Sequence, residues 1–311
     1  KKILDKTLLP LFAFLLALFV GGLVIGFTEN KVLAKISSPI EFLKILGSTV
    51  GNAYLALFQG AIYDPNLAEG KSFMAGFYPL SETMVATAPL ILCGLSVALA
   101  FKSGLFNIGA QGQFIFGAIG ASYIGFKYEM PMVMHILVAT LAGLILAALW
   151  GGIVGLLKAK TGAHEVIVTI MLNYIAAKFL LFILSTKYFL RPGRLDPIAP
   201  SVKESAMLPN LFGVDYRVNI GIFIALAAAV FIWWLLNRSI IGFRFRAVGA
   251  NSSAARTAGI SVSGAMIATM AISGALAGMG GAIHTLGNQY ELTDTVAASF
   301  GFDAITVALL G

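Results

Sequence analysis

Six side chains that can donate or accept hydrogen bonds stand at helical spacing inside otherwise apolar sequence. They are Asn107, Gln111, Gln113, Glu165, Thr169 and Asn173. Asn107 and Gln111 are four residues apart and are predicted to share one helix face, with Gln113 on nearly the opposite side. The last three repeat at every fourth residue and are predicted to form a single polar stripe. Such groups could bind a polar solute transiently, or they could tie neighbouring helices together.

Residues suited to bond-making chemistry are scarce. His135, His164 and His284 lie on three different segments, without companion cysteines or the spacing of a metal site. Cys93 is the single cysteine and lies in an apolar run, so we expect a small packed residue rather than a reactive thiol. No cluster of Ser, His and Asp is recognisable, and no nucleotide-binding pattern GxxxxGK[ST] occurs. We therefore expect no catalytic residue, no metal ligand and no cofactor in this chain, which argues against a membrane enzyme.

The elements that position these residues must be membrane helices. With 59% hydrophobic and 11% charged residues among 311, the chain has too little polar surface to cover a water-soluble globule. Its longest apolar runs approach the roughly 20 residues that cross a bilayer as a helix. Because backbone groups cannot remain unpaired in hydrocarbon, we predict an all-α, polytopic helical bundle. The predicted spans are 8–27, 78–100, 105–126, 131–157, 166–186, 219–237, 262–286 and an eighth that begins near Asp303.

Two stretches leave the number of spans open. Residues 40–62 could span the membrane or lie in its interface, and the polar residues that interrupt this stretch favour the interface. The sequence stops at Gly311 inside an apolar run, so we expect a single permease-type membrane domain over 1–311 that is truncated at its C-terminus. The intact chain would then have about nine or ten helices.

The basic residues indicate an orientation. Lys and Arg fall in short segments almost without acids on one side of the spans, whereas both signs mix on the other side. This pattern places the N-terminus and residues 238–261 in the cytoplasm and residues 28–77 and 187–217 outside. The net charge of +7 is then explained by lipid headgroups and topology, with no need for nucleic acid.

Small residues recur at every fourth position in three of the predicted spans. The series are Ala139, Gly143, Ala147, Gly151 and Gly155; Gly117, Ala121 and Gly125; and Gly274, Gly278 and Ala282. Such seams let helix backbones approach closely, so they predict a compact bundle without indicating a particular function.

The basic segment 237–261 is too polar to enter lipid. Its Ala-Ala-Arg-Thr-Ala-Gly run can form a short helix that ends at Gly259, a residue suited to the C-terminal cap. A cytoplasmic helix of this kind could dock on a soluble partner, or the segment could be an ordinary basic loop.

Four blocks of the sequence resemble one family. SGLFNIGAQGQFIFGAIGA (103–121), HEVIVTIMLNYIA (164–176), RAVGANSSAARTAGIS (246–261) and GFDAITVALLG (301–311) occur in the order found in permeases of ATP-binding cassette (ABC) importers. The chain is similar to the branch for ribose, branched-chain amino acids and nucleosides, and the second block resembles the nucleoside permeases most. The resemblance runs from about Tyr78 to the end and implies a fold similar to the type II importers.

The resemblance implies a docking segment and several partners. The residues implied to couple the chain to an ATPase are Arg246, Ala247, Gly249, Asn251, Ala254, Ala255, Arg256 and Gly259. The ATPase, with its ATP and Mg²⁺, is expected on a separate polypeptide. A second, different permease chain, an extracellular substrate-binding lipoprotein docked near 63–77 and 188–216, nucleoside cargo and the lipid of a bacterial cytoplasmic membrane complete the expected system.

The translocation path is expected to use the six polar residues above together with Phe106, Phe302 and Asp303. The two rings, with Tyr174, offer flat surfaces on which a nucleobase could slide, although lipid-facing or core positions explain most rings in a chain with 23 Phe. Asp303 is expected to cap a helix or a broken half-helix. The alternatives are cargo of ribose, other sugars or branched-chain amino acids, and an ion-coupled secondary transporter. The acidic residues near span ends argue against the secondary transporter.

Overall fold

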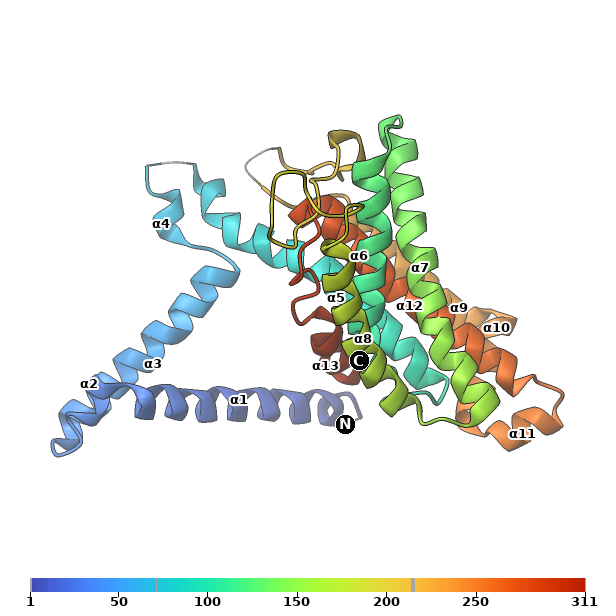
Figure 1. The fold of residues 1–311 in the computed structure, drawn as a ribbon. Coiled ribbons are helices and arrows are strands. Elements are labelled where there is room, and N and C mark those ends of the chain that lie inside the picture. Colours follow the sequence, from blue (N-terminus) through green and yellow to red (C-terminus); the bar gives the residue numbers. More distant parts are fainter. Residues whose placement is uncertain (1, 71, 214–215, 311) are drawn as a thin grey trace. The chain divides into compact units, whose positions relative to one another are not determined.

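The computed structural model describes residues 2–70, 72–213 and 216–310 (Figure 1). Lys1, Lys71, residues 214–215 and Gly311 lie outside the described residues, and Lys71 and residues 214–215 belong to the expected docking segments 63–77 and 188–216. The side chains of Lys2 and Lys6, two of the basic residues that predict the orientation, are also not described. The chain divides into two compact units, Lys1–Thr83 and Met84–Gly311. Across the described residues the structure is helical, with one isolated β-bridge between Asn210 and Asn219. The predicted all-α fold is confirmed.

The first unit is built around two helices, α1 (Lys2–Thr28) and α3 (Pro39–Ala61), joined through α2 (Asn30–Leu33). Gly26 of α1 faces Leu46, and Gly22 faces Val50, so the two helices run antiparallel where they touch. The Tyr54 hydroxyl donates to a backbone carbonyl of α1. The short helices α4 (Pro65–Ala68) and η1 (Phe73–Phe77) then lead into α5 (Tyr78–Lys102). The described part of residues 28–77 is therefore largely helical, and its predicted place outside the membrane stays a prediction.

Six described helices are long and apolar enough to cross a membrane, and they agree with six of the predicted spans. They are Leu11–Thr28 in α1, Phe73–Lys102 through α5, α7 (Met132–Thr161), α8 (Glu165–Leu184), α9 (Gly221–Arg238) and Val262–Gln289 through α12 (Val262–His284). Helix α3 is not among them, and its predicted place in the interface stays a prediction. Helix α13 (Phe300–Leu310) has only 11 residues.

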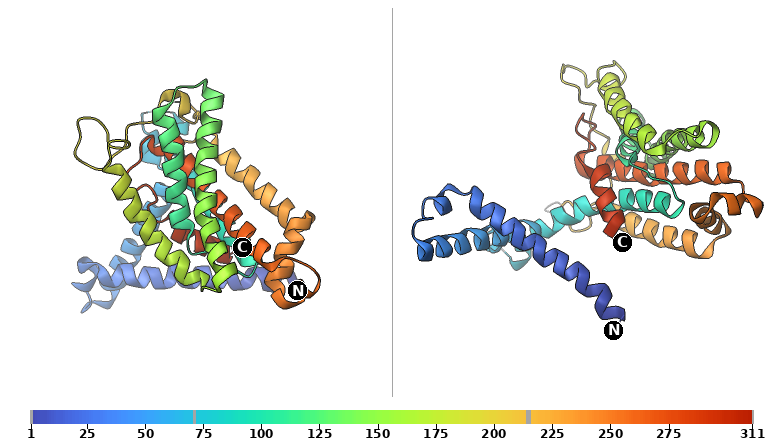
Figure 2. Two further views of the ribbon diagram at one scale, coloured as in Figure 1. Left: turned by 45° about the vertical axis from the view of Figure 1, so that its right-hand side comes forward. Right: turned by 90° about the horizontal axis from the view of Figure 1, so that it is seen from below.

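The predicted span 105–126 is corrected. Its helix, α6, begins five residues later, at Ala110, and ends at Lys127. Fourteen of its 18 residues are buried by other helices, so α6 needs no lipid-facing apolar surface and tolerates glutamines within it. Helices α7 and α12 pack against it and against each other, and α8 packs on a further side (Figures 1 and 2).

The predicted small-residue seams are where α6, α7 and α12 meet. All three series are buried. A Cβ added at Gly117 would lie 2.1 Å from the Gly278 carbonyl oxygen, and one added at Gly151 would lie 2.4 Å from the Met270 carbonyl oxygen. The helices therefore touch backbone to backbone, which only glycine permits at these positions.

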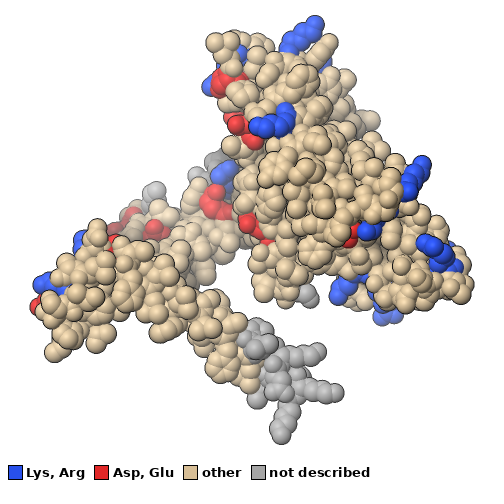
Figure 3. Space-filling view, turned by 60° about the horizontal axis from the view of Figure 1, so that its bottom comes forward, with Lys and Arg blue, Asp and Glu red and all other residues tan. Residues whose placement is uncertain are grey.

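Charged side chains gather at the ends of the second unit, with a broad uncharged surface between them (Figure 3). At one end, the irregular segments 185–213 and 216–220 contain η2 (Glu204–Ala206) and mix both signs of charge. Arg194 pairs with Asp196 at 2.7 Å, and Lys203 pairs with Glu129 at 2.6 Å. The hydrogen bond from Arg194 lowers the pKa of the Asp196 carboxyl.

Candidate functional site

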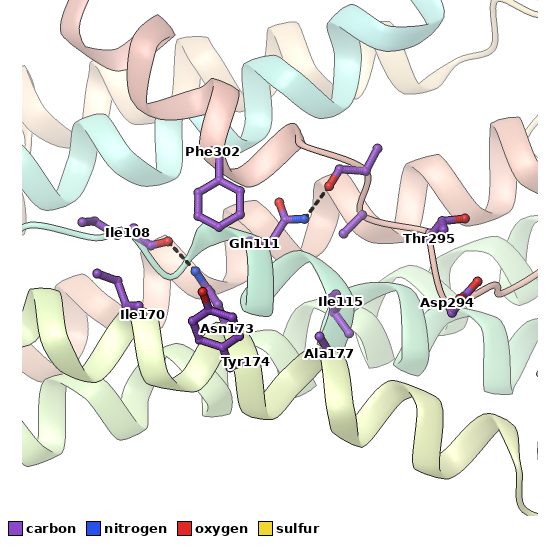
Figure 4. A pocket seen from close by; sticks show the side chains of 12 residues that line it. Ile108, Gln111, Ile115, Ile170, Asn173, Tyr174, Ala177, Asp294, Thr295 and Phe302 are labelled. Atoms are coloured by element: carbon purple, nitrogen blue, oxygen red, sulfur yellow. Dashed lines mark hydrogen bonds between the residues drawn. The ribbon is translucent and has the colours of Figure 1, made fainter.

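A cavity of about 570 Å³ opens in the second unit where four elements meet (Figure 4). Helix α8 forms one wall with Ile170, Asn173 and Tyr174. The start of α6, the loop 290–299 and the start of α13 form the others, contributing among them Gln111 and Phe302. Four residues named from the sequence, Gln111, Asn173, Tyr174 and Phe302, are thus brought to one cavity.

Two irregular segments border this cavity, residues 103–109 before α6 and residues 290–299 before α13. The first lies level with the middle of α12, because the Asn107 side-chain amide donates to the Ser273 hydroxyl at 2.7 Å. Non-helical backbone at membrane depth is stable only when protein buries it or when it lines a cavity. Both α6 and α13 therefore begin as broken helices whose N-terminal ends approach the cavity.

Asn107 and Gln113 do not face the cavity. The Asn107 amide donates to Gln113 Oε1 at 2.9 Å, and its Oδ1 accepts from the Gly109 N–H at 2.9 Å. Both side chains are at most 1% exposed, and Ser96 and Ser273 complete the cluster. The prediction that Asn107 shares a helix face with Gln111 is wrong, because Asn107 precedes the helix. This cluster ties α5, α6 and α12 together.

The amides of Gln111 and Asn173 line the cavity but are bonded to backbone. Gln111 Nε2 donates to the Ala298 carbonyl at 2.7 Å, and Gln111 Oε1 accepts from the Gly301 N–H at 2.8 Å. Asn173 Nδ2 likewise donates to the Ile108 carbonyl at 2.9 Å, and its Oδ1 accepts from an α6 amide. These two residues fix the walls, so the solute-facing polar groups must be others.

The polar groups that face the cavity without a bond to backbone belong to Asp294, Tyr174 and Thr295, whose hydroxyl lies 3.3 Å from the Thr293 hydroxyl. Asp294 and Thr295 are exposed at the cavity, and Tyr174 is 67% exposed. Within the described part of the chain, the side chains of Asp294 and Tyr174 have no hydrogen-bond or ion-pair partner. In the sequence, Asp294 is only one of several acidic residues near span ends, and nothing in the pattern distinguishes Thr295. Their proximity to α8 depends on long-range packing that no local pattern displays.

The predicted polar stripe of α8 exists, but only its last member reaches the cavity. Glu165 pairs with Lys158 at 2.8 Å across the turn between α7 and α8. Thr169 is buried, and its hydroxyl donates to the Val166 carbonyl at 3.0 Å. The roles of these residues in a path stay predictions, and their visible contacts are structural.

The last two predicted path residues also have local partners. Phe106 packs its ring against Phe101, with 4.6 Å between the ring centroids. Asp303 lies in the first turn of α13 and accepts a hydrogen bond from the Ser299 hydroxyl. The predicted place of Asp303 at a helix start is confirmed, while the path role of both residues stays a prediction.

The predicted coupling segment consists of two helices rather than one. Helix α10 (Ile240–Ala250) ends at Asn251, whose side chain caps α11 (Ser252–Thr257) by accepting from the Ala254 N–H at 3.0 Å. After α11, Gly259 adopts a φ of +80°, and the Ile260 N–H returns to the Ala255 carbonyl at 3.0 Å. This is a Schellman cap, so the predicted stop at Gly259 is confirmed.

The exposed and the buried members of the coupling segment differ in what they touch. Arg246, Asn251, Ala254, Arg256 and Gly259 are exposed, Ala247 and Gly249 are half-buried, and Ala255 is buried. The first five form the surface that a soluble partner could contact.

Gly249 faces inward, against the turn between α5 and α6. A Cβ on Gly249 would lie 2.6 Å from the Lys102 carbonyl oxygen and 2.8 Å from the Gly104 nitrogen. Gly104 itself has a φ of +72°, a conformation that favours glycine. This turn continues directly into Asn107 and the cavity-lining Ile108. The coupling segment is therefore in backbone contact with the segment that forms one cavity wall.

Comparison with known proteins gives concordant matches. Residues 80–311 match the family described as the branched-chain amino acid transport system permease component. The chain is 37% identical to the guanosine ABC transporter permease protein NupP of Bacillus subtilis, over 100% of this chain and 81% of that protein. It is 35% identical to the nucleoside ABC transporter permease protein NupB of Lactococcus lactis, over 75% of this chain and 66% of that protein. It is 32% identical to the glucose ABC transporter permease protein TsgB13 of Haloferax volcanii, over 80% of this chain and 68% of that protein. No solved structure matches.

Proposed function

The chain belongs to the permease component family of the branched-chain amino acid transport system, and we propose that it is a membrane-spanning subunit of an ATP-driven importer for nucleosides. The observation that carries the nucleoside assignment is the similarity, over the whole chain, to a permease named for guanosine. The cavity supports it, because about 570 Å³ bounded by aliphatic and aromatic side chains with a few polar groups can hold a solute of nucleoside size.

The energy for transport comes from a separate ATPase that holds the ATP and Mg²⁺. The exposed basic surface around α11 supports this proposal, because a short capped helix projecting from the bundle can enter a groove on a soluble protein. Arg246 and Arg256 are the exposed cations of this surface. The rigid caps at Asn251 and Gly259 hold the helix in the orientation that docking requires.

Two further protein partners follow from the same proposal. A second, different permease chain completes the path, since the relatives include two guanosine permease proteins of Bacillus subtilis, NupP and NupQ. A substrate-binding lipoprotein docks on the segment 188–216, where Arg194 and Asp196 expose both signs of charge. The N-terminus and α11 lie in the cytoplasm of a bacterium, and the chain resides in its cytoplasmic membrane.

The test is reconstitution of the chain with its ATPase, second permease and binding protein in vesicles. Labelled guanosine should enter only with ATP, and excess unlabelled nucleosides should compete. Competition by glucose or ribose alone would favour sugar cargo, the alternative that the glucose permease relative supports. Competition by branched-chain amino acids alone would favour these amino acids, after which the family is named, as the cargo. Uptake driven by an ion gradient without ATP would refute the ABC assignment.

The docking surface has its own test. Arg246→Glu and Arg256→Glu should each abolish uptake while membrane insertion stays intact, because both side chains are exposed and make no ion pair within the described part of the chain. Co-purification of the ATPase in detergent reports docking directly. Normal uptake and normal co-purification by both variants would remove this surface from the proposal.

A further inference from the structure

The cavity has two chemically different ends. In Figure 4 the rings of Phe302 and Tyr174 lie to one side of Gln111, and the side chains of Asp294 and Thr295 lie to the other. The rings are 48% and 67% exposed, so each has a face available to a solute. One end can therefore pack a flat apolar group, and the other can accept and donate hydrogen bonds.

The loop that carries Asp294 is held on both sides. Leu292 and Val296, its neighbours two residues away, are both 0% exposed. The Leu292 carbonyl accepts from the Ala199 N–H at 3.0 Å, and the Ala298 carbonyl accepts from Gln111 at 2.7 Å. A carboxylate on a loop anchored in this way is preorganised, so little conformational entropy is lost when it binds a solute.

The two ends match the two halves of a nucleoside, which joins a flat base to a sugar with adjacent hydroxyls. We propose that Asp294 accepts hydrogen bonds from the ribose hydroxyls of the cargo while the base packs against Phe302 and Tyr174. An acidic side chain bonded to ribose hydroxyls is also how dinucleotide-binding proteins hold that sugar. This inference rests on the proposed function and makes Asp294 a specificity-determining residue within it.

Recognition at both ends has a consequence for related solutes. Free bases lack the hydroxyls and free sugars lack the base, so each uses one end of the cavity only. Loss of a hydrogen bond to a charged group changes an affinity or rate by about tenfold or more. The permease then selects intact ribonucleosides in addition to any selection by the binding protein.

The experiment compares guanosine with 2′,3′-dideoxyguanosine in the reconstituted importer, with the binding protein saturated by each cargo. The measured quantity is the maximal uptake rate of guanosine divided by that of 2′,3′-dideoxyguanosine. It is determined for the wild type, for Asp294→Ala and for Asp294→Asn. Since the same binding protein is present throughout, its own preference cancels between wild type and variant. We expect the wild-type ratio to exceed the variant ratio by about tenfold. Glu41→Gln removes a carboxylate that pairs with Lys35 in the first unit, and it should leave the ratio unchanged.

Three outcomes overturn the inference. An equal fall in the uptake rates of both cargoes in the Asp294 variants means that the carboxylate does not bind the ribose hydroxyls. Unchanged rates for both cargoes mean that it does not contact them. If the wild type carries no nucleoside at all, the proposed function fails and the inference with it, which the wild-type control alone reveals. Thermal unfolding of the purified variants separates any of these results from misfolding.

Discussion

Gly249→Ala should uncouple ATP hydrolysis from uptake. The added methyl would lie 2.6 Å from the Lys102 carbonyl oxygen, 2.7 Å from the Ser103 carbonyl carbon and 2.8 Å from the Gly104 nitrogen. All three neighbours are backbone atoms, so no side chain can rotate away. Helix α10 must then retreat from the turn between α5 and α6 by about 1 Å to restore an ordinary contact, which is the scale of a forced overpacking.

The energetic size of this change decides what should be measured. Overpacking of this kind costs about 1 to 3 kcal/mol, which corresponds to a shift of about 5-fold to 150-fold in an equilibrium between two arrangements. The exposed docking surface around Asn251 and Arg256 is untouched by the methyl. We therefore expect the ATPase to remain bound and to hydrolyse ATP, while uptake falls by at least about fivefold.

The assay is the number of guanosine molecules transported per ATP hydrolysed in vesicles. Gly152→Ala is the matched control, because its added methyl would meet only the Ala271 Cβ, at an ordinary 3.8 Å. An unchanged transport ratio in Gly249→Ala would refute the idea that this contact relays motion. Loss of the ATPase from the complex would show instead that Gly249 serves docking.

Three further measurements test the packing and the charges. Gly151→Ala, whose methyl would lie 2.4 Å from a carbonyl oxygen, should lower the unfolding free energy by about 1 to 3 kcal/mol. Gly152→Ala in the same helix should be neutral or stabilising by up to about 1 kcal/mol. Equal effects of the two variants would contradict close backbone packing at Gly151. Asn107→Ala leaves buried partners unsatisfied and should lower the unfolding free energy by about 1 to 3 kcal/mol, and a neutral result would show that the cluster does not stabilise the packing of α5, α6 and α12. The Arg194–Asp196 pair stabilises segment 190–198 above the ordinary carboxyl pKa, and this contribution is lost as the pH falls through the lowered pKa of Asp196. Hydrogen exchange in residues 190–198 should therefore show loosening only at acidic pH, and loosening near neutrality would point to another group.

The features that the sequence predicted well are those with a local period. The small-residue seams, the inward stripe ending at Asn173 and the stop at Gly259 each follow from helical spacing or from the backbone preference of glycine. Spans α7 and α8 follow from hydropathy alone.

The features that were predicted wrongly or not at all depend on contacts between residues distant in the sequence. Segment 103–109 has helical neighbours and an apolar composition, yet the hydrogen bond from Asn107 to Ser273 stabilises an irregular backbone there. The separate helix α10 before Asn251 was not predicted, although Asn251 and the two serines after it are typical of a helix start. Asp294 becomes notable only because the fold brings its loop beside α8.

Backbone contact among α6, α7 and α12 limits how this protein can move. Where Gly117, Gly143 and Gly278 touch main chain directly, no layer of flexible side chains separates the helices. Sliding one helix by a residue would drive a larger side chain into a neighbouring peptide group. We expect these three helices to move as one rigid group, with rearrangement in the elements around them, among them α8, α10, α13 and the irregular segments 103–109 and 290–299.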